Sequence, residues 1–510
     1  MTQVAQVSAA AGETPHELFR GFDSVSNGTL TSTAVEGEVF MVGLPVKLTI
    51  QLCQSVSELA KVLEIDSSVS VSFLKAFNAT AKMKFMNSLN VTENNLTIVA
   101  YVRNGIGRFK VKEVALKPEI KPLANDEEVR KFVRARGDSF ISEASQGGEY
   151  YAVYTFRTTS RTEQSSLIAS LKAGGISGGL KFDAETQMKL KNFEKVTQVN
   201  WTFTQEMTGV KEIGLPKQDD MIDFARDFPK LPMNSPVTTD FVTTHYEDVP
   251  NFGDGFDKVI ANRRYFVEPE RGLLANLAQL RGVQEQIKRL KAIYRVYRFS
   301  DPGLDAFSPK VDADVKTIED QVHAWKVNPT GDFVRPDLPS LAVGMPELEF
   351  EEGQAASFGS GTGENFDFMP VANAFRDRVR IASIQLAPGI VNKKYHVIRR
   401  LEVGYVSGNG DEKWTKVHGR EGSAGELFTL KAGEFPLSLR IGHGGLIDSI
   451  EMHTDEDRQI KAGGPGGTIA NWTREDDAVV LGFAGRSGGA LDQLRIIHAK
   501  LRPATYVRPN

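Results

Sequence analysis

Apolar and polar residues alternate along two stretches in the first half of the chain. In the first stretch, residues 69–85, the apolar positions are Val69, Val71, Phe73, Phe77, Ala79, Ala81, Met83 and Phe85. Polar residues such as Ser70 and Lys82 stand between them, and Lys75 is the one clear exception on the apolar side. A period of two is the pattern of a β-strand with one apolar and one polar face.

The second stretch, residues 176–191, supports two interpretations. Its apolar or small positions are Ile176, Gly178, Leu180, Phe182, Ala184, Met188 and Leu190, and polar residues alternate with them. Four of these positions also recur every four residues, as on an amphipathic helix. Both stretches exceed the ~9–11 residues that a membrane-spanning β-strand needs, whereas the sequence holds no uninterrupted apolar run of the ~20 residues that a membrane-spanning helix needs. A membrane crossing would therefore use β-hairpins.

Helical spacing replaces the alternation in the segment Gly272–Trp325. Its apolar residues are spaced by three and four, which predicts a helix with one buried face made of Leu280, Val283, Ile287, Leu290, Tyr294 and Tyr297. Four prolines follow, Pro329, Pro336, Pro339 and Pro346. Prolines at this density predict an extended connector and a domain boundary.

From about Ser357 the sequence predicts an all-β domain of short strands separated by glycine clusters. Two segments share a pattern, GHGGLIDSIEMHT around Asp448 and GRSGGALDQLRII around Asp492. In each, Gly-x-x-x-Asp precedes alternating apolar residues. A glycine turn exposes backbone N–H groups, and a carboxylate accepts hydrogen bonds from two neighbouring hydroxyls, so the pattern suits the vicinal diol of a sugar.

Glycine loops around Gly359–Gly363, Gly425 and Gly463–Gly467 suggest three structural repeats. The domain resembles the jacalin-related lectins, whose β-prism has pseudo-threefold symmetry and binds sugars where a glycine loop meets a Gly-x-x-x-Asp loop. The resemblance covers about Ser357–Pro503. In the first repeat Arg399 stands where the aspartate is expected, so this third site is expected to be inactive.

This resemblance implies two carbohydrate-binding sites. The residues of the main site would be Gly361 or Gly363, with Gly488, Gly489, Ala490 and Asp492. The residues of the second site would be Gly444, Gly445, Leu446 and Asp448, with Gly463–Gly467. Beside the aspartates the chain has no aromatic residue for stacking on a sugar ring. A β-prism that serves only as a scaffold or a protein-binding surface is the alternative.

Between Arg136 and Tyr150 the chain reads RGDSFISEASQGGEY. This segment resembles the signature of the membrane attack complex/perforin (MACPF) superfamily, in which a Gly-Thr-His-aromatic stretch is followed by Gly-Gly. The spacing is kept by Gly137, Phe140, Gly147 and Gly148, while Asp138 and Ser139 replace the Thr-His pair. Paired glycines in a strand permit close backbone approach and changes of twist. An ordinary β-bulge, or a generic solvated sheet, is the alternative.

The MACPF resemblance spans roughly residues 15–260 and implies a mechanism. Two helical clusters flanking a bent sheet would unfurl into two membrane hairpins in each subunit of a ring-shaped homo-oligomer. The inserting residues would be Val69, Val71, Phe73, Phe77, Met83 and Phe85, with Ile176, Leu180, Phe182, Ala184, Met188 and Leu190. The expected fold class is multidomain, with an α+β MACPF-type bent antiparallel sheet, a helical connector and an all-β prism. The expected domains are residues 1–265, the helical segment and linker 266–350, and the lectin domain 351–510.

Composition and charge exclude other classes. The chain has 510 residues, 41% of them hydrophobic and 25% charged, as in an ordinary globular protein of two or three domains. Its net charge of −4 gives no global positive field for phosphate backbones, so nucleic acid is not an expected partner. The single cysteine, Cys53, permits no internal disulfide. The eight histidines are scattered, and His418, His443 and His453 fit a β-domain surface better than a zinc site.

We therefore expect no enzyme activity, no cofactor and no metal. The expected function is a pore-forming toxin or defence protein that docks on cell-surface glycans and inserts into the lipid membrane. The alternative is a non-lytic glycan-binding, adhesion or storage protein on the same scaffold; a glycan-processing enzyme is a weaker possibility. The N-terminal residues lack the basic start and apolar run of a signal peptide, so we expect soluble synthesis and release to act on target-cell membranes.

Overall fold

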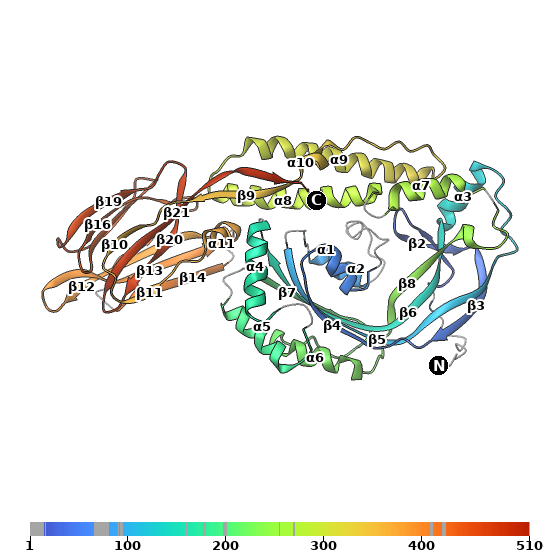
Figure 1. Ribbon diagram of the computed structural model, residues 1–510, viewed down its shortest axis with the longest axis horizontal. Helices are drawn as coiled ribbons and strands as arrows, with labels where there is room; N and C mark the ends of the chain where they lie inside the picture. Colours follow the sequence, from blue (N-terminus) through green and yellow to red (C-terminus); the bar gives the residue numbers. More distant parts are fainter. Residues whose placement is uncertain are drawn as a thin grey trace.

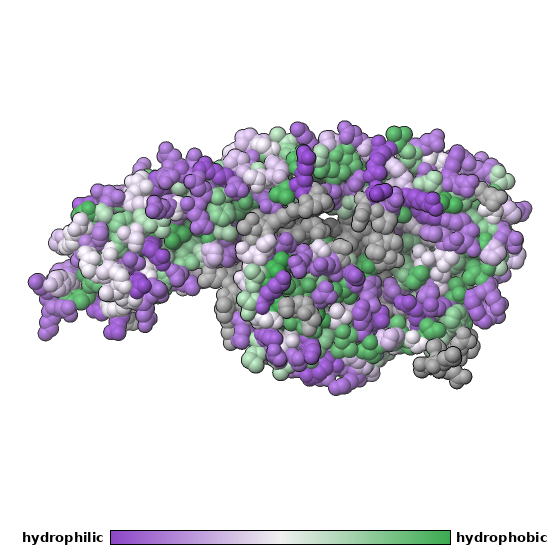
Figure 2. Space-filling view, in the orientation of Figure 1, coloured by the Kyte–Doolittle hydropathy of each residue, from purple (hydrophilic) through white to green (hydrophobic). Residues whose placement is uncertain are grey.

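The computed structural model describes residues 15, 17–65, 81–89, 91, 95–158, 161–176, 180–196, 201–253, 255–268, 271–408, 412–420 and 425–508. The molecule is elongated, with a curved sheet at one end, three smaller sheets at the other, and a layer of long helices along one side (Figure 1). On the face seen in Figure 2, apolar residues are interspersed with hydrophilic ones. Among the described helices, not one combines the length and the apolar character of a membrane-spanning helix.

Eight strands of the described chain form the curved antiparallel sheet. Its long central strands, β5 (Asn95–Leu116) and β6 (Ser139–Arg157), pair with each other over most of their length. The strand order is β2-β1-β6-β5-β3, with β4 also on β5 and with β7 and β8 on β6. The shorter strands are β1 (Arg20–Asp23), β2 (Gly28–Thr33), β3 (Val35–Val42), β4 (Lys47–Cys53), β7 (Trp201–Met207) and β8 (Val237–His245).

The sheet bends where its two central strands change partners. On one side of this point β4 and β7 flank the pair, and on the other side β3 and β8 do. Here the register of β5 shifts between Gly105 and Gly107. A Cβ atom at Gly147 would lie 2.2 Å from a carbonyl oxygen of β5, and one at Gly148 would lie 2.7 Å from the carbonyl oxygen that follows β7. Only glycine permits these close approaches.

Helices cover both faces of the half-sheet that contains β4 and β7. On one face, inside the arc of Figure 1, α1 (Val56–Val62) and α2 (Ala81–Ser88) pack against Tyr101 and Tyr151. The opposite face, with Tyr150 and Tyr154, is covered by α4 (Arg161–Ala173), α5 (Ala184–Val196) and α6 (Met221–Asp227). Consecutive strand residues point to opposite faces, which explains why Tyr150 and Tyr151 contact different helices.

The two alternating stretches are helical wherever the structure describes regular elements in them. Val69, Val71, Phe73 and Phe77 lie outside the described residues. Met83 and Phe85 lie on α2, where Phe85 is buried against the sheet. In the second stretch Ile176, Leu180 and Phe182 precede α5 and pack into the core on the opposite face of the sheet, and Ala184, Met188 and Leu190 lie on α5. In this structure these parts are helical, and their packing buries Phe85 and Leu190; their use as membrane strands stays a prediction.

The alternation predicted that Lys82 would lie on a solvated face. In the structure this prediction is wrong, because Lys82 is only 1% exposed. Its ammonium group lies 3.7 Å from Glu149 Oε1 and 3.9 Å from Asp240 Oδ1. The hydroxyls of Tyr101 and Tyr151 donate hydrogen bonds to Glu149. Burial raises the pKa of the Glu149 and Asp240 carboxyls, and the charge of Lys82 opposes that rise. Helix α2 is thus tied to the bend of the sheet by a buried ion-pair cluster.

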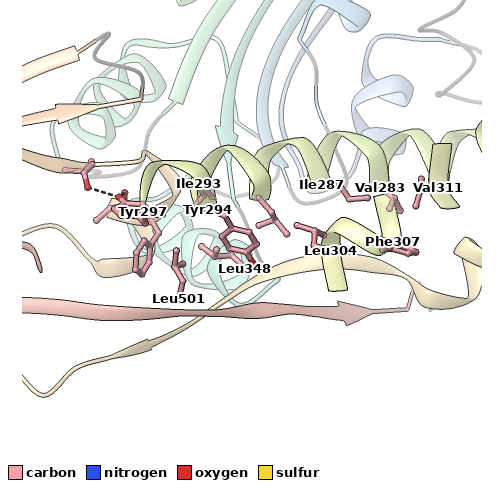
Figure 3. Packing of buried hydrophobic residues seen from close by; sticks show 14 of the residues in the cluster. Val283, Ile287, Ile293, Tyr294, Tyr297, Leu304, Phe307, Val311, Leu348 and Leu501 are labelled. Atoms are coloured by element: carbon pink, nitrogen blue, oxygen red, sulfur yellow. Dashed lines mark hydrogen bonds between the residues drawn. The ribbon is translucent and has the colours of Figure 1, made fainter. Parts of the chain in front are cut away.

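Two long antiparallel helices connect the curved sheet to the C-terminal part. Helix α8 (Leu273–Val296) and helix α9 (Pro302–Val327) confirm the helical prediction, and all six residues of the predicted face are buried. Figure 3 shows four of them, Val283, Ile287, Tyr294 and Tyr297, in one cluster with residues of α9 and with Leu348 and Leu501. The Tyr297 hydroxyl donates hydrogen bonds to the carbonyl oxygens of Ala374 and Val379, at 3.0 and 2.6 Å. The remaining helices of the described chain are α3 (Asp126–Arg136), α7 (Asp257–Val267), α10 (Pro339–Val343) and α11 (Val371–Arg376), and its 3-10 turns are η2 (Gln218–Asp220), η3 (Phe228–Lys230) and η4 (Tyr246–Asp248).

The C-terminal part consists of three antiparallel sheets around a shared apolar core. The first has the order β10-β21-β20-β11 with β9 also on β21, the second β14-β13-β12-β15, and the third β18-β17-β16-β19. Residues from all three sheets line one small central cavity, among them Leu386, Ile450 and Phe483. The strands are β9 (Met345–Glu352), β10 (Ala356–Gly359), β11 (Glu364–Phe366), β12 (Arg380–Val391), β13 (Tyr395–Ser407), β14 (Glu412–Gly419), β15 (Leu427–Thr429), β16 (Pro436–His443), β17 (Ile447–Thr454), β18 (Gln459–Gly463), β19 (Thr468–Thr473), β20 (Ala478–Ser487) and β21 (Leu491–Val507). The predicted all-β C-terminal domain of three repeats is confirmed.

Secondary-structure elements cross both predicted domain boundaries. Residue 265 lies within α7, whose Phe266 is fully buried, and residue 350 lies within β9. Strand β9 pairs with the last half of β21, and the same end of β21 packs on α8. The helical layer and the prism therefore share one continuous core.

Candidate functional sites

Each sheet of the prism has the same irregularity in its central hairpin. The register shifts by one residue around Asp492 in β21, around Asp448 in β17 and around Arg399 in β13. At such a β-bulge the extra residue is left unpaired by the ladder, and its side chain is re-aimed. Arg399 thus occupies, in the first repeat, the position that the two aspartates occupy in the others.

At the first site the carboxylate of Asp492 meets the glycine loop 359–363. The Thr362 hydroxyl donates a hydrogen bond to Asp492 Oδ1 at 2.7 Å, and the Ser360 N–H donates to the backbone oxygen of Asp492 at 3.0 Å. The loop begins and ends at glycines with positive φ, 96° at Gly359 and 81° at Gly363. Within the described residues, Asp492 Oδ2 is buried without a hydrogen-bond partner. Among these residues Oδ2 therefore lacks a donor, and the groups around it leave it almost no contact with solvent.

The turn between β20 and β21 forms the other wall of this site. Gly488 and Gly489 are exposed, and the Gly488 N–H donates a hydrogen bond to the Ala490 oxygen at 2.9 Å. Ala490 as a whole is 2% exposed, so this residue offers a ligand almost no surface. Gly361, at the tip of the opposite loop, is exposed.

The second site repeats this arrangement around Asp448. The loop 463–467 begins and ends at positive-φ glycines, 104° at Gly463 and 72° at Gly467, and the Gly464 N–H donates to the backbone oxygen of Asp448 at 3.0 Å. A Cβ atom at Gly467 would lie 2.5 Å from Asp448 Oδ2. Partial burial raises the pKa of the Asp448 carboxyl, and the neighbouring His443 opposes that rise.

The remaining residues predicted for the second site lie in the β16–β17 turn. There the Gly444 N–H donates a hydrogen bond to the Leu446 oxygen at 2.9 Å, as Gly488 does to Ala490 in the first site. Gly445 is exposed in the same turn. Both predicted groups are thus brought together, each as one glycine loop, one hairpin turn and one aspartate.

Substitution of Gly363 by alanine is expected to weaken sugar binding at the first site by about tenfold, equivalent to ~1.4 kcal/mol. The new Cβ would lie 2.6 Å from Asp492 Oδ2, and the φ of 81° is unfavourable for alanine. Isothermal titration with the sugar that the wild-type protein binds best is the measurement. Gly361→Ala is the matched control, because no atom lies within 4 Å of its Cβ position. Equal effects of the two substitutions would contradict this account of the loop.

The sequence did not single out three residues that support these sites. Thr362 binds the Asp492 carboxylate, and the Ser360 hydroxyl donates a hydrogen bond to the Gly445 oxygen at 2.8 Å, which joins the two sites. His443 Nδ1 accepts a hydrogen bond from the Gly359 N–H at 3.4 Å. The available signal was the presence of two hydroxyl residues inside a glycine loop, where small polar side chains reach nearby backbone.

The residues of the predicted perforin-type motif lie in two separate places, where α3 leads into β6 and in the middle of β6. Gly137 ends α3 with a φ of 78°, and Phe140 is fully buried against Tyr246, with ring centroids 5.5 Å apart. Gly147 and Gly148 lie at the bend of the sheet. Asp138 is fully buried, and burial together with the nearby Asp23 raises the pKa of its carboxyl to about 6. The first pair therefore shapes the core and the second pair shapes the bend.

Among the described residues, no group of three His, Cys, Asp or Glu side chains is placed to hold a metal ion. His418 stacks on Phe366 with ring centroids 3.8 Å apart, and burial lowers the pKa of its imidazole to about 4. His453 pairs with Glu451, and His443 lies between the two glycine loops.

Three sheets around one core, with a glycine loop facing an aspartate at two of three equivalent bulges, form a β-prism. Residues 355–497 of this β-prism match the family model of the jacalin-like lectin domain. Its solved structural neighbours include a Malaysian banana lectin, with 20% identity, coverage of 29% of this chain and 96% of that chain, and a TM-score of 0.24. The Calystegia sepium agglutinin has 18% identity, coverage of 30% and 98%, and a TM-score of 0.24. A lamprey immune protein has 21% identity, coverage of 28% and 43%, and a TM-score of 0.24. No curated protein matches the chain.

Proposed function

We propose that this protein binds cell-surface glycans through Asp492 and Asp448 and then perforates the underlying membrane. The lectin part of the proposal rests on one observation, the repetition of the same aspartate, glycine loop and hairpin turn at two equivalent bulges. Asp492 Oδ2 is also buried without a hydrogen-bond partner among the described residues, and a buried polar atom without a partner calls for an explanation. A sugar hydroxyl would supply the missing donor.

The perforating part rests on how α5 uses its alternating residues. As a helix, this segment buries Thr186 and Leu190 but leaves Met188 59% exposed and Ala184 exposed. As a strand, the same segment would place Ala184, Thr186, Met188 and Leu190 on one face. The charged residues between them would lie on the other face. Conflict between the pattern of a segment and its structure indicates a segment with a second state. The proposed second state is a membrane hairpin.

Release of α2, on the other face of the sheet, would require breaking the cluster of Lys82, Glu149 and Asp240. Removing one partner from a buried ion pair is strongly unfavourable, by about 3–5 kcal/mol, because a charge is left uncompensated. Insertion must therefore be driven by contacts that a single free subunit lacks. Neighbouring subunits and lipid, concentrated on a glycan-bearing surface, would supply these contacts. The mechanism contains no catalytic step, and it places the protein outside its target cell, in a homo-oligomeric ring.

Dye release from liposomes that carry erythrocyte glycolipids tests this function. We expect release from these liposomes and a reduction of about tenfold or more from liposomes of the same lipids without glycans, because docking raises the local protein concentration. Binding to the glycolipid liposomes without any release would instead support a non-lytic glycan-binding protein. Equal release from both kinds of liposome would separate perforation from sugar binding.

A further inference from the structure

The three bulges of the prism lie on one continuous face, because their loops contact one another. The Ser360 hydroxyl of the first glycine loop reaches the Gly445 oxygen of the second site. The second glycine loop reaches the third corner, where a Cβ at Gly464 would lie 2.4 Å from the Cβ of His396. The third corner reaches back to the first site, because Arg399 Nε donates a hydrogen bond to the Gly489 oxygen at 3.3 Å. A ligand in the first site therefore lies beside Arg399.

Arg399 is held in this position from two sides. Its aliphatic stem lies over Gly389, where a Cβ would come within 2.6 Å of Arg399 Cδ. Its guanidinium is anchored by the Gly489 oxygen through Nε only, and within the described part of the chain no carboxylate pairs with it. The two terminal nitrogens of the fork thus remain available. Guanidinium groups bind sulfate and carboxylate through two parallel hydrogen bonds.

Further cationic residues lie in the segments that pair with Arg399 or precede it in the chain. Arg420 follows the positive-φ Gly419 and donates its backbone N–H to the Arg399 oxygen at 3.1 Å. Lys393 and Lys394 form the tip of the same β12–β13 hairpin and are exposed. Where the other two corners present an aspartate to a hydroxyl, this corner presents a cation. Its ligand is therefore an anionic group rather than a diol.

We infer that Arg399 selects glycans that carry an anionic substituent, a sulfate or a carboxylate, next to the sugar held by Asp492. This inference rests on the proposed glycan binding at the first site and adds the charge of the ligand. One glycan would contact both corners: the aspartate would accept from its hydroxyls, and the arginine would donate to its anionic group.

An array that presents each oligosaccharide in a neutral, a sulfated and a carboxylated form tests the inference with the full chain. We expect the wild-type protein to bind one charged form about tenfold more tightly than its neutral parent, with a preference that declines as salt is raised. Arg399→Gln should remove the preference and keep binding to the neutral form. Gly389→Ala should reduce the preference by displacing the Arg399 stem. Comparison of binding to the sulfated and the carboxylated forms shows which of the two anionic groups Arg399 prefers.

Arg400→Gln is the matched control, since it removes the same charge from the neighbouring residue, which pairs with Glu402 instead. Equal binding of charged and neutral forms by the wild-type protein would overturn the inference and leave the proposed sugar binding intact, as would a preference that survives Arg399→Gln. Binding to no array member would overturn both. A further outcome would be binding to glycan-free phosphatidylserine vesicles that depends on Arg399, without a preference among glycans. That outcome would show that Arg399 binds a lipid headgroup and would overturn the inference.

Discussion

The double substitution Asp492→Asn with Asp448→Asn is expected to abolish measurable binding to glycan surfaces. Each aspartate is the charged acceptor of its site, and a hydrogen bond to a charged group contributes about 1.5–3 kcal/mol, or roughly tenfold to a hundredfold in affinity. Because a dense glycan surface engages both sites at once, losing both removes the gain from multivalency as well. Binding to an array of immobilised oligosaccharides, followed by dye release from glycolipid liposomes, measures both consequences.

Asp367→Asn is the matched control for this pair. Asp367 directly follows β11, a strand of the sheet that contains Asp492; its side chain is 67% exposed and forms a surface ion pair with Arg495. Exposed pairs of this kind contribute about 0–1 kcal/mol, so binding should stay unchanged. Each single aspartate variant should bind a multivalent surface with intermediate strength. Full glycan binding by the double variant, with its fold intact by circular dichroism, would disprove the proposed sites.

A covalent cross-link between α5 and η2 is expected to reduce dye release to background without affecting glycan binding. Lys191 and Asp219 form an ion pair at 3.3 Å, with side chains 41% and 61% exposed, so cysteines at both positions are accessible to a short bifunctional maleimide. The native Cys53 does not interfere, because it is buried and burial raises the pKa of its thiol to about 12. If α5 must leave the sheet to form a hairpin, the cross-link prevents it.

Cysteines in place of Lys291 and Asp305 provide the control cross-link. These residues also form an exposed ion pair, at 2.9 Å, but they join α8 to α9, which the proposed mechanism keeps folded. The control protein should release dye at the wild-type rate, and so should the Lys191→Cys and Asp219→Cys protein before cross-linking. Normal release by the cross-linked α5 variant would show that α5 stays in place.

The lectin domain was predictable from the sequence because its chemistry is local and repeated. The glycines and the aspartate of each hairpin turn lie within five residues of one another, and the fold closes each glycine loop onto the bulge of a neighbouring strand. The helical face of α8 was equally predictable, since its spacing is set by the helix itself. The contacts of Ser360 with Gly445 and of Arg399 with Gly489 were not predictable, because they join different sheets.

The alternating stretches show why pattern alone was insufficient for the N-terminal part. A period of two predicted that Lys82 would lie on a solvent-exposed face. The fold instead buries it beside Glu149 and Asp240, which are far away in the sequence. Burial of a charge is acceptable only where partners compensate it, and such partners are known only from the tertiary structure. Met188 shows the opposite case, an apolar residue that the pattern places inside and the helix leaves exposed.

Strand β21 gives the prism a mechanical role. Asp492 lies at its beginning, and near its end Leu501 packs against α8 while the Ala504 N–H donates a hydrogen bond to Asp301, at the start of α9. At ~3.3 Å per residue, the part of this strand between Asp492 and Ala504 spans about 40 Å and connects the sugar-binding site to the helical layer. In the proposed mechanism, a flexible tether would let the body turn freely above its target. A paired strand would instead act as a lever arm, so that the orientation of the captured glycan would fix the tilt of the curved sheet over the membrane.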